Sequence, residues 1–280
     1  MAKGLFQNVR YKGTVGGVTY RVVNGEYIAS NKSSLSKETV ANSPAFANTR
    51  KLNSEFRGVA YFSKALQNEF LRIVSSRPGN KAALKTYLYP EIVKLAREGM
   101  SKSTAQVFGE RSILSSNLVG TFDGFQPTKE RFEDYASVNY TISDAEPVGN
   151  GQKNLEVSPF VPANTFNAPE GATGYMLIGV GVYVPNYVFN VGTQKYEPVS
   201  NNVDYPTAIG SFGVIEAGDV NSTEKISPEV EYIDPISWED GTKGLYMVGI
   251  GVIFTKQVGS QVIGLREGLT MKILKSYSWA

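Results

Sequence analysis

The sequence predicts an α+β protein, and three observations carry this prediction. A glycine-rich basic hairpin opens the chain, one long helical pattern runs from Ser43 to Ser76, and short β-prone runs separated by turn residues follow from Val119 onward. We therefore expect an N-terminal β-hairpin arm and a helical unit, followed by an antiparallel β-sandwich or barrel. The expected divisions are a basic arm with a linker, a helical unit and a β-sandwich-like domain, at residues 1–42, 43–118 and 119–280.

The arm is predicted from two β-prone runs joined by a tight turn. Residues 18–23 and 26–29 flank Asn24-Gly25, a dipeptide that strongly favours a two-residue hairpin. An isolated hairpin is at best marginally stable in water, so the arm must pack on the rest of the chain or on a neighbouring chain. Residues 30–42 are rich in Ser and Lys, and we expect a polar linker there.

The long helix is predicted from its start signal and its apolar stripe. Ser43 can cap the first free amides, and Pro44 suits the first helical position. A rod of about thirty residues is roughly 45 Å long, and it either packs inside its own domain or forms a contact between subunits. The apolar stripe has helical spacing and consists of Leu52, Phe56, Val59, Leu66, Phe70 and Ile73.

Two shorter helices are expected to complete the helical unit. Residues 80–99 have a helical pattern with a break at Pro90. Residues 103–106 form a capping-box pattern, which predicts a third helix ending at about Leu114. The side chains expected in the core of this unit are Tyr87, Tyr89 and Phe108.

The second half of the chain is a series of short β-prone runs between Gly, Pro, Asn and Asp, a pattern typical of an antiparallel sandwich or barrel. Two of the runs, residues 174–184 and 244–254, share three glycines and one valine at one register. They are either two core strands of one sandwich or the trace of a duplicated half-domain. Their almost continuous apolar character predicts strands covered on both faces. The runs cover residues 136–142, 154–157, 175–184, 187–189, 209–215, 230–233, 245–254 and 269–277.

Composition argues against an enzyme. The chain contains no His and no Cys, so the commonest general base, the Ser-His and Cys-His nucleophile systems, the usual zinc ligand sets and disulfides are all excluded. Carboxylate, Lys or Tyr chemistry is not excluded by this argument. We expect no enzymatic activity, no cofactor and no metal. No apolar run approaches the ~18 residues that span a membrane, and the first residues lack a hydrophobic signal region, so we expect cytoplasmic synthesis and no membrane insertion.

The net charge of +2 conceals an asymmetry between the two halves. Residues 1–112 contain 18 Lys and Arg against 7 Asp and Glu, whereas residues 113–280 contain 10 against 19. This distribution predicts either an acidic partner for the first half or self-association of opposite halves.

The opening residues carry a resemblance to a known group of proteins. The motifs are Gly16-Gly17-Val18-Thr19-Tyr20, Asn24-Gly25, the Lys- and Ser-rich linker and the run from Ser43 to Arg50 with Glu55-Phe56. Over roughly residues 10–75 the chain resembles uncharacterised proteins from Bacteroidetes bacteria and their phages, which have a Gly-rich hairpin, a long helix and a β-sandwich-like C-terminal half. The resemblance implies a Bacteroidetes or phage origin and a part in a virion or virion-like assembly. It implies no catalytic residue.

We therefore expect a non-enzymatic structural protein, a subunit of a phage virion or virion-like complex that binds other protein subunits as a homo- or hetero-oligomer. One alternative is a glycan-binding module. Another is a nucleic-acid-binding protein that uses the basic first half, because tyrosines beside Lys and Arg can stack on the bases of a single strand. Nucleic acid is possible but not the favoured partner. The candidate interaction residues are Tyr11, Lys12, Tyr20, Arg21, Tyr27, Arg50 and Arg57; the candidate ligand-binding rim is Tyr232, Trp238 and Asp240.

Overall fold

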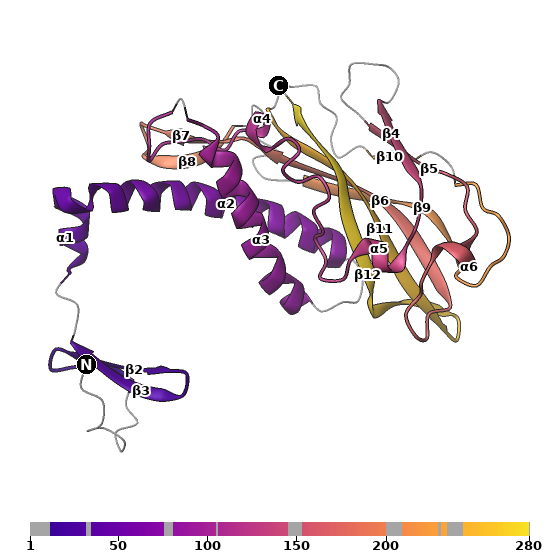
Figure 1. Ribbon diagram of the computed structural model, residues 1–280, viewed down its shortest axis with the longest axis horizontal. Helices are drawn as coiled ribbons and strands as arrows, with labels where there is room; N and C mark the ends of the chain where they lie inside the picture. The colour runs from indigo at the N-terminus through magenta and orange to yellow at the C-terminus, as the bar shows by residue number, and fades with distance from the viewer. Residues whose placement is uncertain are drawn as a thin grey trace. The chain divides into compact units, whose positions relative to one another are not determined.

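The computed structural model is an α+β structure, as the sequence predicts. Contacts divide the chain into two compact units, Met1–Arg50 and Lys51–Ala280 (Figure 1). We call the second unit the body. The divisions expected from the sequence fall after residues 42 and 118 instead, because local patterns do not show that the helices and the sheet share one core. The structure describes residues 12–31, 35–75, 81–104, 106–144, 153–199, 209–228, 231–233 and 243–279.

The first unit contains the predicted hairpin and one further strand. Strands β1 (Gly13–Val15), β2 (Val18–Val23) and β3 (Glu26–Asn31) form an antiparallel sheet in the order β1-β2-β3. Asn24 and Gly25 both have positive φ, at 51° and 82°, as the tight turns of two-residue hairpins require. We call this three-stranded sheet the arm.

The predicted polar linker, residues 30–42, contains a short helix that was not expected. Helix α1 (Lys37–Asn42) begins after Ser36, whose hydroxyl accepts a hydrogen bond from the backbone N–H of Thr39 at 2.9 Å. A serine in this position satisfies one of the free amides at a helix start, and the run of polar residues conceals that signal.

The long helix begins later than its sequence signals indicate. A 3-10 turn, η1 (Pro44–Phe46), follows Ser43, and the Ser43 side chain makes no capping hydrogen bond. Its carbonyl instead accepts a hydrogen bond from the Arg50 guanidinium at 2.8 Å. Helix α2 (Ala47–Ser75) then runs for 29 residues, which confirms the predicted rod.

Helix α3 (Lys81–Ser101) continues through Pro90, where a break was expected. Pro90 is exposed, and on the solvent side of a helix water can bind the carbonyl that proline leaves unpaired. Tyr87 and Phe108 are each 37% exposed and Tyr89 is half-buried, so their assignment to the core was wrong. None of the described helices is both long and apolar enough to cross a membrane.

The third predicted helix is absent from the described residues between 102 and 114, which form a turn-rich loop. Gly109 has a φ of +103°, a backbone conformation that residues other than glycine rarely adopt. The Ser103 hydroxyl donates a hydrogen bond to the Ser112 carbonyl at 3.0 Å. These contacts close the loop on itself and override the capping-box pattern. A short helix, α4 (Ser115–Leu118), follows.

One four-stranded antiparallel sheet forms the centre of the body. Its order is β12-β11-β6-β9, from strands β6 (Gly174–Pro185), β9 (Ile209–Asp219), β11 (Gly244–Val258) and β12 (Gln261–Trp279). The remaining elements are a three-stranded sheet in the order β10-β5-β4, a two-stranded hairpin and two short helices: β4 (Tyr140–Asp144), β5 (Lys153–Val157), β10 (Glu231–Ile233), β7 (Tyr187–Asn190), β8 (Lys195–Pro198), α5 (Phe132–Tyr135) and α6 (Pro162–Thr165).

The two similar glycine-containing runs are the neighbouring central strands β6 and β11. They pair antiparallel from Gly174↔Thr255 to Gly244↔Pro185. A Cβ added at Gly244 would lie 2.3 Å from the Tyr183 ring, so this glycine lets the aromatic side chain approach the backbone.

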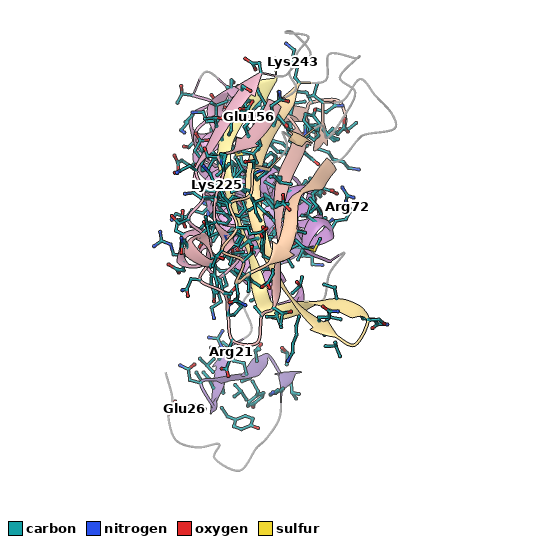
Figure 2. All side chains as sticks on the ribbon, turned by 90° about the vertical axis from the view of Figure 1, so that its right-hand side faces the viewer. Arg21, Glu26, Arg72, Glu156, Lys225 and Lys243 are labelled. Carbon is teal, nitrogen blue, oxygen red and sulfur yellow. The ribbon has the colours of Figure 1, made fainter. Side chains whose placement is uncertain are left out.

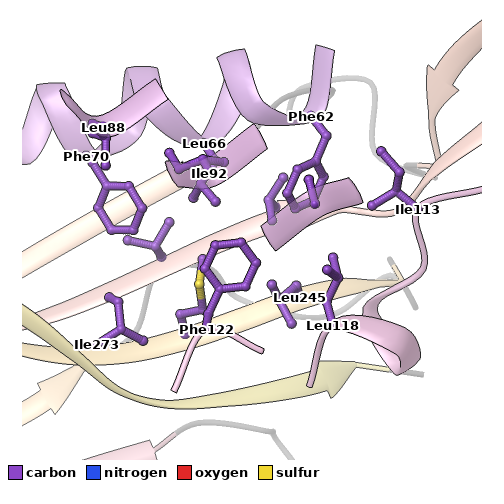
Figure 3. Close-up of a cluster of buried hydrophobic side chains, with 14 of the residues drawn as sticks. Phe62, Leu66, Phe70, Leu88, Ile92, Ile113, Leu118, Phe122, Leu245 and Ile273 are labelled. Atoms are coloured by element: carbon purple, nitrogen blue, oxygen red, sulfur yellow. The ribbon is translucent and has the colours of Figure 1, made fainter. Parts of the chain in front are cut away.

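Both faces of the central sheet are covered, as the apolar runs predict. On one face α2 and α3 share a core with the sheet, and Phe62, Leu66 and Phe70 of α2 point toward the strands (Figure 3). On the other face Leu155 and Val157 of β5 pack with β6 and β11 in a second core. The helices and the small sheet therefore form outer layers on the central sheet.

The apolar stripe of α2 is only partly buried. Val59, Leu66, Phe70 and Ile73 are buried as expected, and Phe62 joins them, although the predicted stripe omits it. Leu52 and Phe56 are 52% and 50% exposed, which contradicts their place in a buried stripe. The stripe therefore continues on the helix beyond the part that the sheet covers.

Candidate functional site

A buried ion pair fixes α2 to the loop that follows α3. The Glu55 carboxylate, in a residue only 5% exposed, accepts hydrogen bonds from Nε and Nη2 of Arg111, each at 2.7 Å, and from the Gly109 backbone N–H at 2.9 Å. Burial alone would raise the pKa of Glu55, but the hydrogen bonds from Arg111 and Gly109 and the Arg111 charge outweigh it, so the pKa is lowered. Glu55 therefore stays ionised.

The β7-β8 hairpin is held against α2 by one tyrosine. The Tyr196 ring packs directly on Gly58 of α2, where an added Cβ would lie 2.5 Å from its Cδ1 atom. The Tyr196 hydroxyl donates to the carbonyl of Arg111 at 3.0 Å. Helix, loop and hairpin therefore hold one another in place at this point of the body.

Two hollows lie on the exposed side of α2, and together we call them the Tyr61 groove. The larger, about 590 Å³, is bounded by α2 and α3 and lined by Ala60, Tyr61, Lys64, Gln67, Thr86, Tyr89 and Pro90. The smaller, about 120 Å³, is bounded by α2 and the β7-β8 hairpin and lined by Ser54, Arg57, Tyr61, Gln194, Lys195 and Tyr196. Tyr61, 51% exposed, lines both hollows.

The groove has a positive character. Arg57, Tyr61 and Lys64 follow one another at helical spacing on one face of α2, and Lys195 reaches the same groove from β8. No carboxylate lines the groove among the residues that the structure describes. The Glu197 carboxylate accepts hydrogen bonds from the Asn190 amide and the Thr193 hydroxyl in the hairpin turn, and it interacts electrostatically with Lys195. The groove is therefore suited to a negatively charged ligand.

Of the predicted interaction residues, Arg57 lies in this groove. Its neighbours Tyr61 and Lys64 were missed, although their spacing from Arg57 was a visible signal, because charged residues off the apolar stripe are usually a solvated helix face. Lys195 gives no sequence signal, since β8 was not predicted. Arg50 has a structural role, because its guanidinium donates to the carbonyls of Val40 and Ser43 at 2.9 and 2.8 Å.

The arm has one apolar face. The strand register places Tyr20 opposite Ala29 and Val22 opposite Tyr27 on one face, while Arg21 lies opposite Ile28 on the other. Predicted residues Tyr20 and Tyr27 therefore share a face and Arg21 does not; Lys12 is exposed just before β1. None of residues 12–31 is buried. The apolar face consists of Val15, Val18, Tyr20, Val22, Tyr27 and Ala29.

The remaining predicted residues give no site. Tyr11, Trp238 and Asp240 lie outside the described residues, and Tyr232 pairs with Asn154 in the small sheet, with its side chain outside the description. Among the described side chains there is no group of three or more Asp or Glu residues that could hold a metal ion.

Comparisons with protein-family models, with curated proteins and with solved structures find no match to this chain.

Proposed function

We propose that the protein is a non-enzymatic assembly subunit whose arm docks, through its apolar face, on the body of a second copy of the chain. The observation that carries this proposal is the apolar face of the arm, in which no described residue is buried. An isolated hairpin is at best marginally stable in water, and β1 adds only three residues to it, so a surface that covers this apolar face would stabilise the arm.

Charge supports a second copy as the partner. Residues 1–50 contain 7 Lys and Arg against 2 Asp and Glu, a net charge of +5; residues 51–280 contain 21 against 24, a net charge of −3. The positive first unit, which contains the arm, and the negative body attract one another between copies. The half-exposed pair Leu52 and Phe56 on α2 offers further apolar contact area. The proposed assembly is a virion or virion-like particle, on the strength of the sequence resemblance.

Light scattering coupled to size-exclusion chromatography tests this proposal with the full chain. The wild-type protein should form an oligomer whose mass rises with concentration, and Val15→Asp with Tyr27→Asp, which charges the apolar face, should give a monomer with an unchanged body by circular dichroism. The matched control, Thr14→Asp with Ser30→Asp, places the same charges on the opposite face and should still assemble. A wild-type chain that stays monomeric up to its solubility limit would contradict the proposal.

Glycan binding stays a prediction, since the described residues do not include the side chains of its proposed rim.

A further inference from the structure

We propose that the Tyr61 groove binds single-stranded nucleic acid, with a base in the larger hollow and a backbone phosphate in the smaller one. This inference is independent of the arm and concerns a different surface of the molecule. It rests on the chemistry of the two hollows and on the position of Tyr61, which lines both.

The larger hollow has the walls that a base requires. Tyr61, Tyr89, Pro90 and Ala60 present rings and apolar surface, and bases stack on aromatic side chains whatever their identity. Gln67 and Thr86 belong to the same lining, but the Gln67 amide oxygen already accepts a hydrogen bond from Lys64 at 3.1 Å, so the aromatic and apolar walls carry the proposed contact with the base.

The smaller hollow has the groups that a phosphate requires. Arg57 of α2 and Lys195 of β8 line one space of about 120 Å³ with Ser54 and Gln194. Within the described part of the chain, neither cation is in an ion pair. A phosphate placed here would therefore gain two charge-assisted contacts without breaking a salt bridge.

The groove is fixed before any ligand arrives. Tyr196 lines the smaller hollow and packs on Gly58 of α2. Its hydroxyl donates a hydrogen bond to the Arg111 carbonyl, and the Arg111 guanidinium donates to the Glu55 carboxylate of α2. The cation from β8 and the cation from α2 are thus carried by elements that are locked together. A site on rigid elements loses little freedom when the ligand binds.

The presence of an aromatic hollow beside a basic one distinguishes a nucleic-acid site from a site for an acidic peptide. An acidic peptide would use Arg57, Lys64 and Lys195 but would leave the aromatic hollow unused. A nucleotide unit uses both hollows and stacks on Tyr61 between them. The chemistry of the lining therefore favours the nucleotide.

Fluorescence anisotropy of a labelled oligothymidylate tests the proposal with the full chain at low salt. Tyr61→Ala should weaken binding about tenfold, while Tyr61→Phe, which keeps the ring, should bind like the wild type. Arg57→Gln with Lys195→Gln should weaken binding and reduce the slope of log affinity against log salt by about 0.7, as the loss of one phosphate contact on a single strand requires.

The matched control is Lys129→Gln with Lys225→Gln. Both lysines are exposed, and Lys225, labelled in Figure 2, lies next to a residue that packs on the opposite face of the central sheet from the helices. This pair removes the same charge and should leave binding unchanged. An equal loss for both pairs, an unchanged affinity for Tyr61→Ala, or displacement of the oligonucleotide by oligoglutamate would overturn the proposal. Light scattering on the same variants separates this result from the assembly test, because none of these side chains belongs to the arm.

Discussion

Arg111 donates two hydrogen bonds to the Glu55 carboxylate, from Nε and Nη2, across 56 residues of sequence. The planar guanidinium matches both oxygens at once, so the contact fixes the angle as well as the distance between α2 and the loop. Since Tyr196 is bonded to the Arg111 carbonyl, this ion pair also determines where the β7-β8 hairpin lies on α2.

Replacing Glu55 with Gln should lower the free energy of unfolding at neutral pH by about 2 to 4 kcal/mol, because Arg111 loses its partner in a largely buried place. The pKa of Glu55 is lowered in the folded protein, so the stabilisation is present above its usual value of 4.5 and is lost as the pH falls through the lower folded value. Urea unfolding from neutral to acid pH should therefore show the gap between wild type and Glu55→Gln closing below that value.

Glu98 provides the control for the ion pair. Its side chain is 54% exposed and faces Lys102 at 3.4 Å, so Glu98→Gln should change stability by no more than about 0.5 kcal/mol. A gap for Glu55→Gln that stays constant into acid would show that the carboxylate charge is not what stabilises this junction.

Gly58→Ala should destabilise the protein by about 1 to 3 kcal/mol, because the added methyl group would meet the Tyr196 ring. The sign is informative, since alanine is favoured over glycine inside a helix by about 1 kcal/mol. In a Tyr196→Ala background the ring is gone, and Gly58→Ala should then raise stability. Thermal unfolding of the four proteins measures this reversal; destabilisation in both backgrounds would count against the proposed contact.

Sequence signals correctly predicted the helices and strands whose formation depends mainly on residues close together in the sequence. Asn24-Gly25 places the arm turn, the 3.6-residue spacing of Val59, Leu66 and Phe70 gives α2, and the two glycine-containing runs give β6 and β11. In each case the sequence pattern and the final environment agree. The predicted α+β class followed from these elements.

Tertiary contacts account for what was missed. Residues 103–106 have a capping-box pattern, but Glu55 binds Gly109 and Arg111 and holds the segment as a loop. Tyr61 and Lys64 lie at helical spacing from Arg57, but Tyr89 and Lys195 reach the groove from α3 and β8, and no sequence spacing relates these two residues to Arg57. Leu52 and Phe56 are exposed because the sheet does not extend along α2 as far as these residues. The helical spacing of apolar residues does not show where that cover ends.

Thr128 and Thr270 should respond in opposite ways to the same substitution. Both are buried, at 3% and 0% exposed. The Thr128 hydroxyl accepts the Met271 N–H at 3.0 Å, so Thr128→Val leaves a buried donor unpaired and should cost about 1 to 3 kcal/mol. The Thr270 hydroxyl has no hydrogen-bond partner among the described residues, so Thr270→Val should be neutral or stabilising. Urea unfolding distinguishes the two, and equal losses would contradict the assignment.

The outer edge of β12 is covered by the segment that follows α4, and this cover should protect the protein from aggregation. The Gly124 N–H donates to the Ile273 carbonyl at 2.9 Å, and the Asp123 carboxylate accepts from the Ser276 backbone N–H at 2.8 Å. An uncovered edge strand can pair with other chains, so Asp123→Ala should raise light scattering on heating and speed amide exchange at Ser276.

The control for this prediction is Asp134→Ala. Asp134 is an exposed aspartate of α5, and within the described part of the chain its carboxylate makes no hydrogen bond or ion pair to β12. Asp134→Ala removes the same charge from the surface as Asp123→Ala, so a general effect of net charge on solubility would appear in both variants. Faster exchange at Ser276 and higher scattering in Asp123→Ala alone would show that the carboxylate holds the covering segment in place. If Ser276 stays protected while scattering rises, the edge remains covered and the aggregation arises elsewhere.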